Sequence, residues 1–349
     1  MADYAHKMTD KYIKRMEGKV VDVYERASDE IEVKLKDYYK RYEKKDQKWR
    51  QWVEEGKKSK DEYKQWRKGQ LLVGKRWEQM KDSIAHDYRN ADKIALGIVN
   101  GERAGVYALN HNWATYQIEK NLGINTSYEL YSREVVQRIL TQNPRMLPRP
   151  GKRMGQKIRD WKTSVWTKRQ LHSVATQAIV QGESIPNIAK RLAREVGQKS
   201  SNSMIRNART MMTGAQNAGR MDANNRARKM GIEVDDYWLA TIDERTRTSH
   251  RLLDGTKRGE DGLFANGLAF PGDPAGDPSE VYNCRCTMIG QIKGFEDDLR
   301  DMDFRLDPDV SDMTYEEWQQ ARPVSKPIDS QKRAGEAIKA RYVKEYATN

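Results

Sequence analysis

The chain has 349 residues and a formal net charge of +13, and 33% of its residues are charged while 37% are hydrophobic. That apolar share is low for one compact core of this length, so the composition disfavours a single globular domain and predicts extended, solvent-exposed helices joined to a smaller packed domain. No stretch approaches the length of a membrane span and the first residues lack the apolar segment of a secretory signal, so we expect no membrane insertion.

Residues 1–142 are predicted to form a charged, aromatic-rich helical region. They contain no proline, and apolar residues recur at helical spacings, with Gly56 and Gly69 as predicted breaks between helices. Residues 34–82 carry a net charge of +8, and Trp49, Trp52, Trp66 and Trp77 lie among these charges. We expect the indoles to join one helix to another or to a neighbouring subunit, rather than to stack on nucleic-acid bases.

Residues 143–151 hold three prolines and a glycine, which cannot continue a helix, so we place a linker there. Residues 152–230 then predict a basic helical module, in which Ser184 is an expected N-cap with Pro186 in the first turn. The net charge of residues 152–229 is +13. Such a surface suits nucleic acid or an acidic protein, although a solvated helix face is the simpler interpretation of charge alone.

Residues 231–292 predict a small α+β domain, with strands expected at 234–242 and 281–290 and a Gly-, Pro- and Asp-rich loop between them. Residues 293–349 predict an acidic linker and a C-terminal docking tail, with a helix expected over 331–346. The predicted fold class is therefore α+β. Its N-terminal two thirds are mainly α-helical, and a small α+β domain with few short strands follows.

Titratable side chains gather in this small domain. A helix over 246–254 would place His250 and Asp254 on one face, and a strand would point the thiols of Cys284 and Cys286 the same way. One interpretation is a zinc site made by His250, both cysteines and a carboxylate, from Asp254 or Asp243, or a water. The other is a metal-free hydrogen-bonded cluster, whose members would be Asp243, Arg245, Arg247, His250, Asp254 and Arg285.

The order of these residues resembles the phage Mu protein F-like, or head-morphogenesis, family. The matching pattern is W-L-A-x-x-D-x-R-T-R-x-S-H from Trp238 to His250, then L-D-G, F-P and N-C-R-C, preceded by the R-T and A-Q-N-A-G-R segments at 209–220. The resemblance covers about 205–290, and Met211-Met212 departs from the polar or acidic residue that often follows R-T. Residues 1–150 show no motif that we can assign.

The resemblance implies a minor capsid protein that enters the procapsid near the portal and contacts packaged DNA. Portal, capsid or scaffold proteins and double-stranded DNA would be its partners, inside the virion head and, during assembly, in the host cytoplasm. On this interpretation the candidates for DNA or portal contact are Arg206, Arg209, Arg220 and Arg226.

Two other classes stay open. One is a DNA-binding protein delivered with the genome. The other is a metal-dependent or ADP-ribosyltransferase-type enzyme, because domains similar to this one are sometimes fused to such toxins. The sequence has one Glu-x-Glu, at Glu30-Ile-Glu32, inside a predicted helix and far from any predicted strand. A zinc deaminase would need H-x-E and P-C-x-x-C, which are absent. We therefore expect no catalytic residues and no enzymatic activity.

Overall fold

The computed structural model describes residues 3–136, 162–295, 305–307 and 309–324. The chain divides into two compact units. The first comprises Met1–Lys14, Val99–Gly151 and Asn207–Asn349, and the second comprises Arg15–Ile98 and Lys152–Arg206. The linker at 143–151, the helix at 331–346 and much of the acidic stretch after 295 lie outside the described residues. The segment boundaries drawn from the sequence stay predictions.

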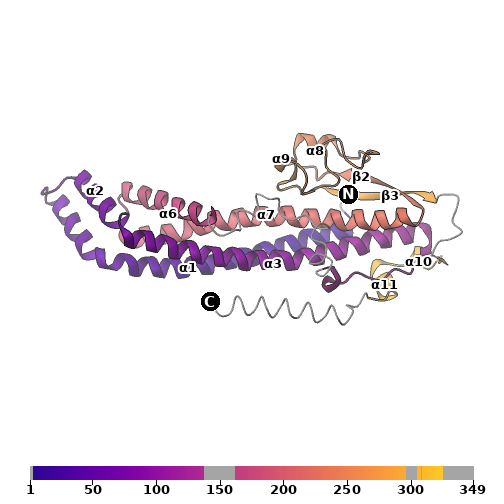
Figure 1. Cartoon of the computed structure of the whole chain (residues 1–349), viewed down its shortest axis with the longest axis horizontal. Coiled ribbons are helices and arrows are strands. Elements are labelled where there is room, and N and C mark those ends of the chain that lie inside the picture. The colour runs from indigo at the N-terminus through magenta and orange to yellow at the C-terminus, as the bar shows by residue number, and fades with distance from the viewer. Residues whose placement is uncertain (1–2, 137–161, 296–304, 308, 325–349) are drawn as a thin grey trace. The chain divides into compact units, whose positions relative to one another are not determined.

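The predicted fold class is confirmed, because the described residues are mainly helical with small antiparallel sheets (Figure 1). The long helices are α1 (Tyr4–Glu54), α2 (Lys60–Leu71), α3 (Lys75–Leu122), α6 (Lys162–Val180) and α7 (Ile185–Lys229). None of the described helices is long and apolar enough to cross a bilayer. The break at Gly56 is found at a positive φ of 69°, but Gly69 lies within α2 and the next break falls at Gly74.

In the second unit, aromatic side chains join the helices to one another. Trp49 of α1 stacks on Trp66 of α2, with ring centroids 5.3 Å apart and planes 20° apart. Trp77 of α3 is fully buried, 6.0 Å from Tyr38 and 6.3 Å from Tyr39 of α1. The expectation that these indoles join helices is confirmed for these contacts.

In the first unit, β2 (Ile232–Leu239) and β3 (Thr287–Phe295) lie side by side (Figure 1). They pair antiparallel, with Trp238 opposite Met288. Residues of β2 alternate between buried and more exposed positions, as expected of a strand with one covered face. Ile232 and Val234 pack with Ile118 of α3 and Ala227 of α7. Between the strands lie two short helices, α8 (Thr248–Leu252) and α9 (Pro278–Val281).

Two local predictions in this domain are wrong. The helix expected over 246–254 is only the five-residue α8, because Leu253 ends it and Gly255 turns the chain at a φ of 71°. The strand expected over 281–290 begins at Thr287 instead, so the two cysteines precede β3 rather than lying on it. Asn283 starts this non-strand segment with a φ of 55°, a left-handed conformation that asparagine tolerates better than most residues.

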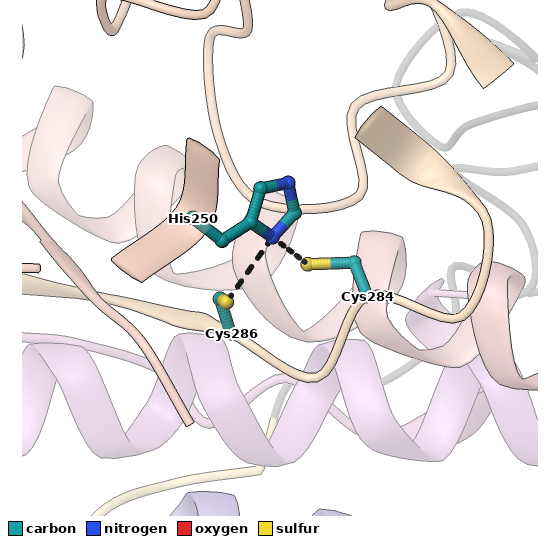
Figure 2. Close-up of side chains that lie close together, drawn as sticks. All are labelled: His250, Cys284 and Cys286. Atoms are coloured by element: carbon teal, nitrogen blue, oxygen red, sulfur yellow. Dashed lines mark hydrogen bonds between the residues drawn. The ribbon is translucent and has the colours of Figure 1, made fainter. Parts of the chain in front are cut away.

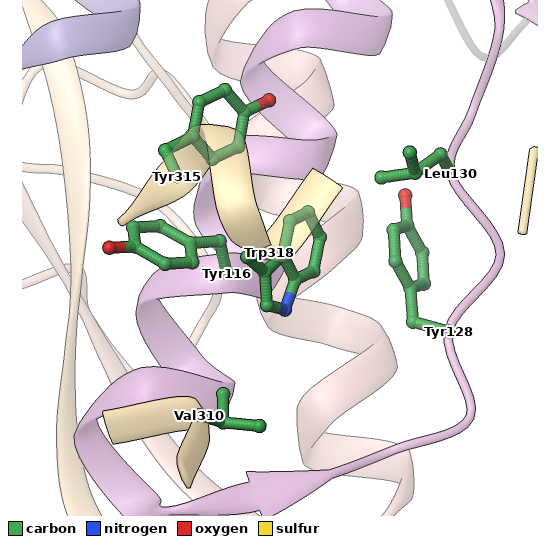
Figure 3. Close-up of a cluster of buried hydrophobic side chains, with 6 residues drawn as sticks. All are labelled: Tyr116, Tyr128, Leu130, Val310, Tyr315 and Trp318. Atoms are coloured by element: carbon green, nitrogen blue, oxygen red, sulfur yellow. The ribbon is translucent and has the colours of Figure 1, made fainter. Parts of the chain in front are cut away.

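The chain after 304 packs on the end of α3 in the same unit. β4 (Arg305–Leu306) pairs with β1 (Ile124–Asn125), and α10 (Asp309–Asp312) and α11 (Tyr315–Gln320) follow. Figure 3 shows their buried cluster, which joins Tyr116, Tyr128 and Leu130 to Val310, Tyr315 and Trp318. The part of the docking tail that the structure describes therefore docks on its own chain.

Candidate metal centre

A stripe of buried polar residues on α7 supports the small domain. Its positions in the sequence are 210, 213, 217, 220 and 224, a spacing of three or four that places them on one helix face. Thr210 Oγ1 accepts a hydrogen bond from Asn283 N at 3.1 Å, and Thr213 Oγ1 donates one to Cys284 O at 2.7 Å. These bonds hold the backbone on both sides of the first cysteine against the helix.

Asn217 is the central residue of this polar stripe. Its amide nitrogen donates to Pro271 O at 2.9 Å and to Cys286 O at 3.2 Å, and its amide oxygen accepts from Met288 N at 2.8 Å. The Pro271 loop comes very close to the helix, since a Cβ on Gly272 would lie 2.9 Å from Gly214 N. The fully buried Asn217 side chain thus joins α7 to the Phe270-Pro271 loop, to the segment that carries Cys284 and Cys286, and to β3.

Arg220 also belongs to the stripe and lies in the interior. Its guanidinium donates to both carboxylate oxygens of Asp3 at 2.7 Å, to Met288 O at 3.1 Å and to Asn110 Oδ1 at 2.9 Å. With 3% of the residue exposed, these internal partners hold the side chain inside the fold. We therefore leave Arg220 out of the residues proposed to contact DNA or a portal.

The other three arginines singled out in the sequence are differently placed. Arg206 and Arg209 are exposed on α7, whereas Arg226 is half-buried with its guanidinium 4.8 Å from the ring centre of Tyr128. Arg226 therefore takes part in packing within the first unit.

His250, Cys284 and Cys286 come together beside the stripe (Figure 2). His250 Nδ1 lies 3.6 Å from Cys284 Sγ and 3.4 Å from Cys286 Sγ. The candidate ligand atoms all lie within 4.8 Å of one another, and none of the three residues is more than 2% exposed. Figure 2 shows both sulfurs facing the same ring nitrogen, from the segment before β3, while α8 carries the histidine. This buried group could hold a metal ion.

The far side of the His250 ring faces a carboxylate. Its Nε2 lies 3.0 Å from Glu280 Oε2, although the alignment of the two atoms falls short of a hydrogen bond. Ser249 Oγ donates to Glu280 at 3.1 Å, so the carboxylate itself is held in place. Trp238 packs against the His250 ring at 5.1 Å in an edge-to-face arrangement. The imidazole orientation is therefore set by contacts on several sides.

The two thiols interact with each other, and their pKa values move in opposite directions. A hydrogen bond from Cys284, together with the neighbouring His250, lowers the pKa of Cys286 to about 5 even though burial opposes the shift. The same hydrogen bond, with burial, raises the pKa of Cys284 above its usual value. The pair therefore favours one thiolate at Cys286 when no metal is bound.

Asp243 and Arg285 form a second contact near the group. The guanidinium donates to the carboxylate through two nitrogens, at 2.5 and 2.6 Å, and this pairing holds the pKa of Asp243 well below its usual value. Arg245 donates its backbone N–H to the same carboxylate at 2.9 Å, and Arg247 donates to Tyr282 O. The Asp243–Arg285 and Arg247–Tyr282 contacts thus join the 241–247 loop to the segment that carries Cys284 and Cys286.

Asp254 stands apart from the His/Cys group. Its carboxylate accepts a hydrogen bond from Ala240 N at 2.8 Å, and the neighbouring Gly255 N donates to Trp238 O at 2.8 Å. The Leu-Asp-Gly segment therefore packs along β2. The carboxylate beside the histidine belongs instead to Glu280, which was not among the residues predicted from the sequence. Glu280 is 30 positions from His250, and no local spacing pointed to it.

Comparisons with known proteins agree with the motif. Residues 169–289 match the family model described as Phage Mu protein F like protein. The chain is 26% identical over 259 residues to "Minor head protein GP7" of Bacillus phage SPP1, covering 72% of this chain and 79% of that protein.

It is also 27% identical over 209 residues to "NAD(+)--arginine ADP-ribosyltransferase EFV" of Enterococcus faecalis, covering 58% of this chain. The chain spans 40% of the length of that enzyme. No solved structure matches the chain. The matched family region contains the α7 stripe, His250, Glu280 and both cysteines. Residues 169–289 are therefore similar to the Phage Mu protein F-like family.

Proposed function

We propose that the protein is a minor head protein of a tailed phage or prophage, incorporated in the procapsid near the portal. The observation that carries the proposal is the similarity to the SPP1 minor head protein, which extends over most of both chains. Portal, capsid or scaffold proteins would be its partners. It would work inside the head, and in the host cytoplasm during assembly.

We include contact with packaged DNA in this proposal. The charge of residues 152–229, net +13, supports it, because neutralising phosphates with lysine and arginine releases counterions. Arg206 and Arg209 are the exposed members of the candidate set. A DNA-binding protein delivered with the genome is the alternative within the same family.

We propose a structural rather than a catalytic role for the His250 group. All three side chains are buried. Thr213 and Asn217 donate hydrogen bonds to the backbone carbonyls of Cys284 and Cys286 and so hold the two cysteines in place. Zinc is the metal that we propose for it, because imidazole and thiolate are ligands that zinc prefers.

The similarity to an ADP-ribosyltransferase supports a second candidate function. Against it, Glu30 and Glu32 lie within α1, and Glu32 makes a 2.7 Å ion pair with Lys36 one turn away. The test is incubation of the purified chain with labelled NAD⁺ and an arginine-rich acceptor protein. We expect no transfer of label. Transfer that survives replacement of both glutamates by glutamine would show an enzyme with other catalytic residues.

The head proposal is tested by quantitative mass spectrometry of procapsids and of DNA-filled heads from assembling cells. We expect the protein in both particles at a fixed ratio to the portal, and in the portal-containing fraction after gentle disruption. Recovery of the protein only from the free soluble fraction would overturn the proposal.

A further inference from the structure

The separations of His250 Nδ1 from Cys284 Sγ and from Cys286 Sγ match those between ligand atoms of a tetrahedral metal site. Zinc–sulfur bonds of about 2.3 Å and zinc–nitrogen bonds of about 2.0–2.1 Å, at tetrahedral angles, separate a ligand nitrogen from a ligand sulfur by roughly 3.6 Å. The two observed separations from Nδ1 are 3.6 and 3.4 Å. The two nitrogen–sulfur separations are therefore those that a tetrahedral zinc ion would need.

Hydrogen bonding can also hold these three side chains together. A neutral Nδ1 accepts fully from one S–H, and the second sulfur is then paired with the first. Both sulfurs lie within 3.6 Å of Nδ1, and all three residues are at most 2% exposed. A metal ion would satisfy the nitrogen lone pair and both sulfurs at once.

Glu280 adds the feature expected around a metal-bound histidine. Such a histidine almost always directs its second ring nitrogen at a carboxylate, carbonyl or water, which fixes the tautomer and the ring orientation. Here Glu280 Oε2 lies 3.0 Å from Nε2, a close contact that is not aligned as a hydrogen bond, and Ser249 and Asn266 contact the same carboxylate. A proton on Nε2 leaves the Nδ1 lone pair directed at the sulfurs.

We propose that His250 Nδ1, Cys284 Sγ and Cys286 Sγ bind one zinc ion, with Glu280 as the residue that positions the histidine. Two sulfurs and an imidazole favour zinc over magnesium or calcium, which prefer oxygen ligands. The ion would join α8 to the segment before β3, two parts of the chain that are 34 residues apart in the sequence. This inference rests on the structural role proposed above for the His250 group and not on the role in the head.

The first test is metal analysis of the full chain, purified without chelator from cells supplied with zinc. We expect about one zinc per chain, as in a structural N/S site. Cobalt exchanged for zinc should give a near-ultraviolet thiolate-to-cobalt charge-transfer band and the intense visible bands of a tetrahedral site. Less than roughly a tenth of an equivalent of zinc, with no thiolate band after adding cobalt, would overturn the proposal.

Variants locate the ion. His250→Ala and Cys286→Ser should each lose most of the zinc, whereas His172→Ala, which removes an exposed histidine on α6, should keep it. Retention of full zinc by both site variants would overturn the assignment. Should a site variant fail to fold, as judged by circular dichroism, the cobalt spectrum of the unaltered chain decides alone.

The role of Glu280 is tested by zinc affinity, measured by competition with a chromophoric chelator. Glu280→Gln should weaken binding about 10–100-fold while the cobalt bands keep their form, because the metal ligands are unchanged. Glu260→Gln, at an exposed carboxylate of the same domain, is the matched control and should bind as the unaltered chain does. Equal affinities of the two variants would remove the positioning role.

Discussion

Asn217 shows how much one buried side chain contributes to this domain. Replacing it with leucine keeps a similar volume but leaves Met288 N, Pro271 O and Cys286 O without their partner. Each buried polar group left unpaired costs about 1–3 kcal/mol, so we expect Asn217→Leu, which leaves three, to lower the free energy of unfolding by at least about 3 kcal/mol. Urea denaturation followed by circular dichroism measures this change.

The control lies on the same helix. Asn202 is exposed, so Asn202→Leu should change the free energy of unfolding by no more than about 0.5 kcal/mol. Equal effects of the two substitutions would show that the hydrogen bonds of Asn217 contribute little.

Asp92 predicts a pH dependence of stability. Burial raises its pKa from 3.8 to about 6, while Tyr24 donates a hydrogen bond to it. The folded state therefore holds this proton more tightly than the unfolded state, and the associated stability is complete below about pH 4 and lost as the pH rises through 6. The shift corresponds to on the order of 3 kcal/mol.

Asp92→Asn should remove this dependence, since an amide stays neutral and can still accept from Tyr24. Urea denaturation from about pH 3.5 to 7.5 gives the difference in unfolding free energy between variant and unaltered chain. The unfolding free energy of the variant minus that of the unaltered chain should rise between about pH 4 and 6 and then level off. A flat or falling difference would contradict the assigned pKa.

At the residue scale, part of the site could be predicted from the sequence. His250, Cys284 and Cys286 were named from their chemistry and lie together in the fold. Asp254 was assigned to them through an assumed helix that ends before it, and Glu280 was missed. The spacing of residues along a chain predicts neighbours within one helix or strand. It does not predict which loop brings a carboxylate to the far side of an imidazole.

Gly219 of α7 is predicted to be necessary for its close approach to α3. A Cβ at this position would lie 2.6 Å from Tyr107 O, which is backbone and cannot move aside easily. We expect Gly219→Ala to lower the free energy of unfolding by about 1–3 kcal/mol, through overpacking. Thermal and urea denaturation measure the effect.

Gly18→Ala is the matched control. Gly18 lies in α1, where a Cβ would have no neighbouring atom within 4 Å, so alanine there should raise stability by up to about 1 kcal/mol through helix propensity. The prediction is that Gly219→Ala lowers the free energy of unfolding while Gly18→Ala raises it. A stabilising Gly219→Ala would show that the two helices can separate without loss.

Glu119 at the end of α3 joins three separate segments. Its fully buried carboxylate accepts from Trp318 Nε1 at 2.6 Å, Arg322 Nη2 at 2.7 Å and Thr126 N at 2.8 Å. Glu119→Gln leaves the buried guanidinium without its countercharge, so we expect a loss of about 3–5 kcal/mol. Trp318→Phe keeps an aromatic ring and loses one N–H donor, for a smaller loss of about 1–3 kcal/mol.

Limited proteolysis measures the consequence for the C-terminal segment. We expect cleavage after residue 304 to be faster in Glu119→Gln than in Trp318→Phe, and slowest in the unaltered chain. An unchanged cleavage rate in Glu119→Gln would show that the aromatic cluster alone holds the segment.

At the scale of elements, helical periodicity predicted that the regions of the long helices are helical, because the signal repeats over many turns. It did not predict where each helix ends: Gly69 lies within α2, Gly101 within α3 and Gly197 within α7. Short elements gave no such signal. The two-residue strands β1 and β4 pair across about 180 positions, so their pairing could not be predicted from local pattern. The polar stripe of α7 was also missed. Its spacing of three and four is visible in the sequence, but a buried helix face is ordinarily recognised by apolar residues, and these side chains are polar.

At the scale of the whole chain, charge is unevenly divided. Residues 152–229 carry +13 whereas residues 230–349 carry −8. A net charge of either sign acts over about 8–10 Å at physiological ionic strength, so the basic region would attract DNA where the acidic region repels it. The structure distinguishes these arginines by exposure, since Arg220 is buried while Arg206 and Arg209 are exposed.

If the protein contacts packaged DNA through α7, its affinity for random-sequence duplex should fall steeply with salt. The logarithm of the binding constant falls with the logarithm of salt concentration by about 0.9 for each phosphate neutralised. Replacing both Arg206 and Arg209 with alanine should therefore weaken binding at every sequence and reduce the slope by roughly 2. Arg245→Ala, at a 78% exposed side chain in the acidic region, should change neither quantity. Fluorescence anisotropy over a salt series measures both, and binding that is absent or insensitive to salt would leave a head protein that does not use DNA.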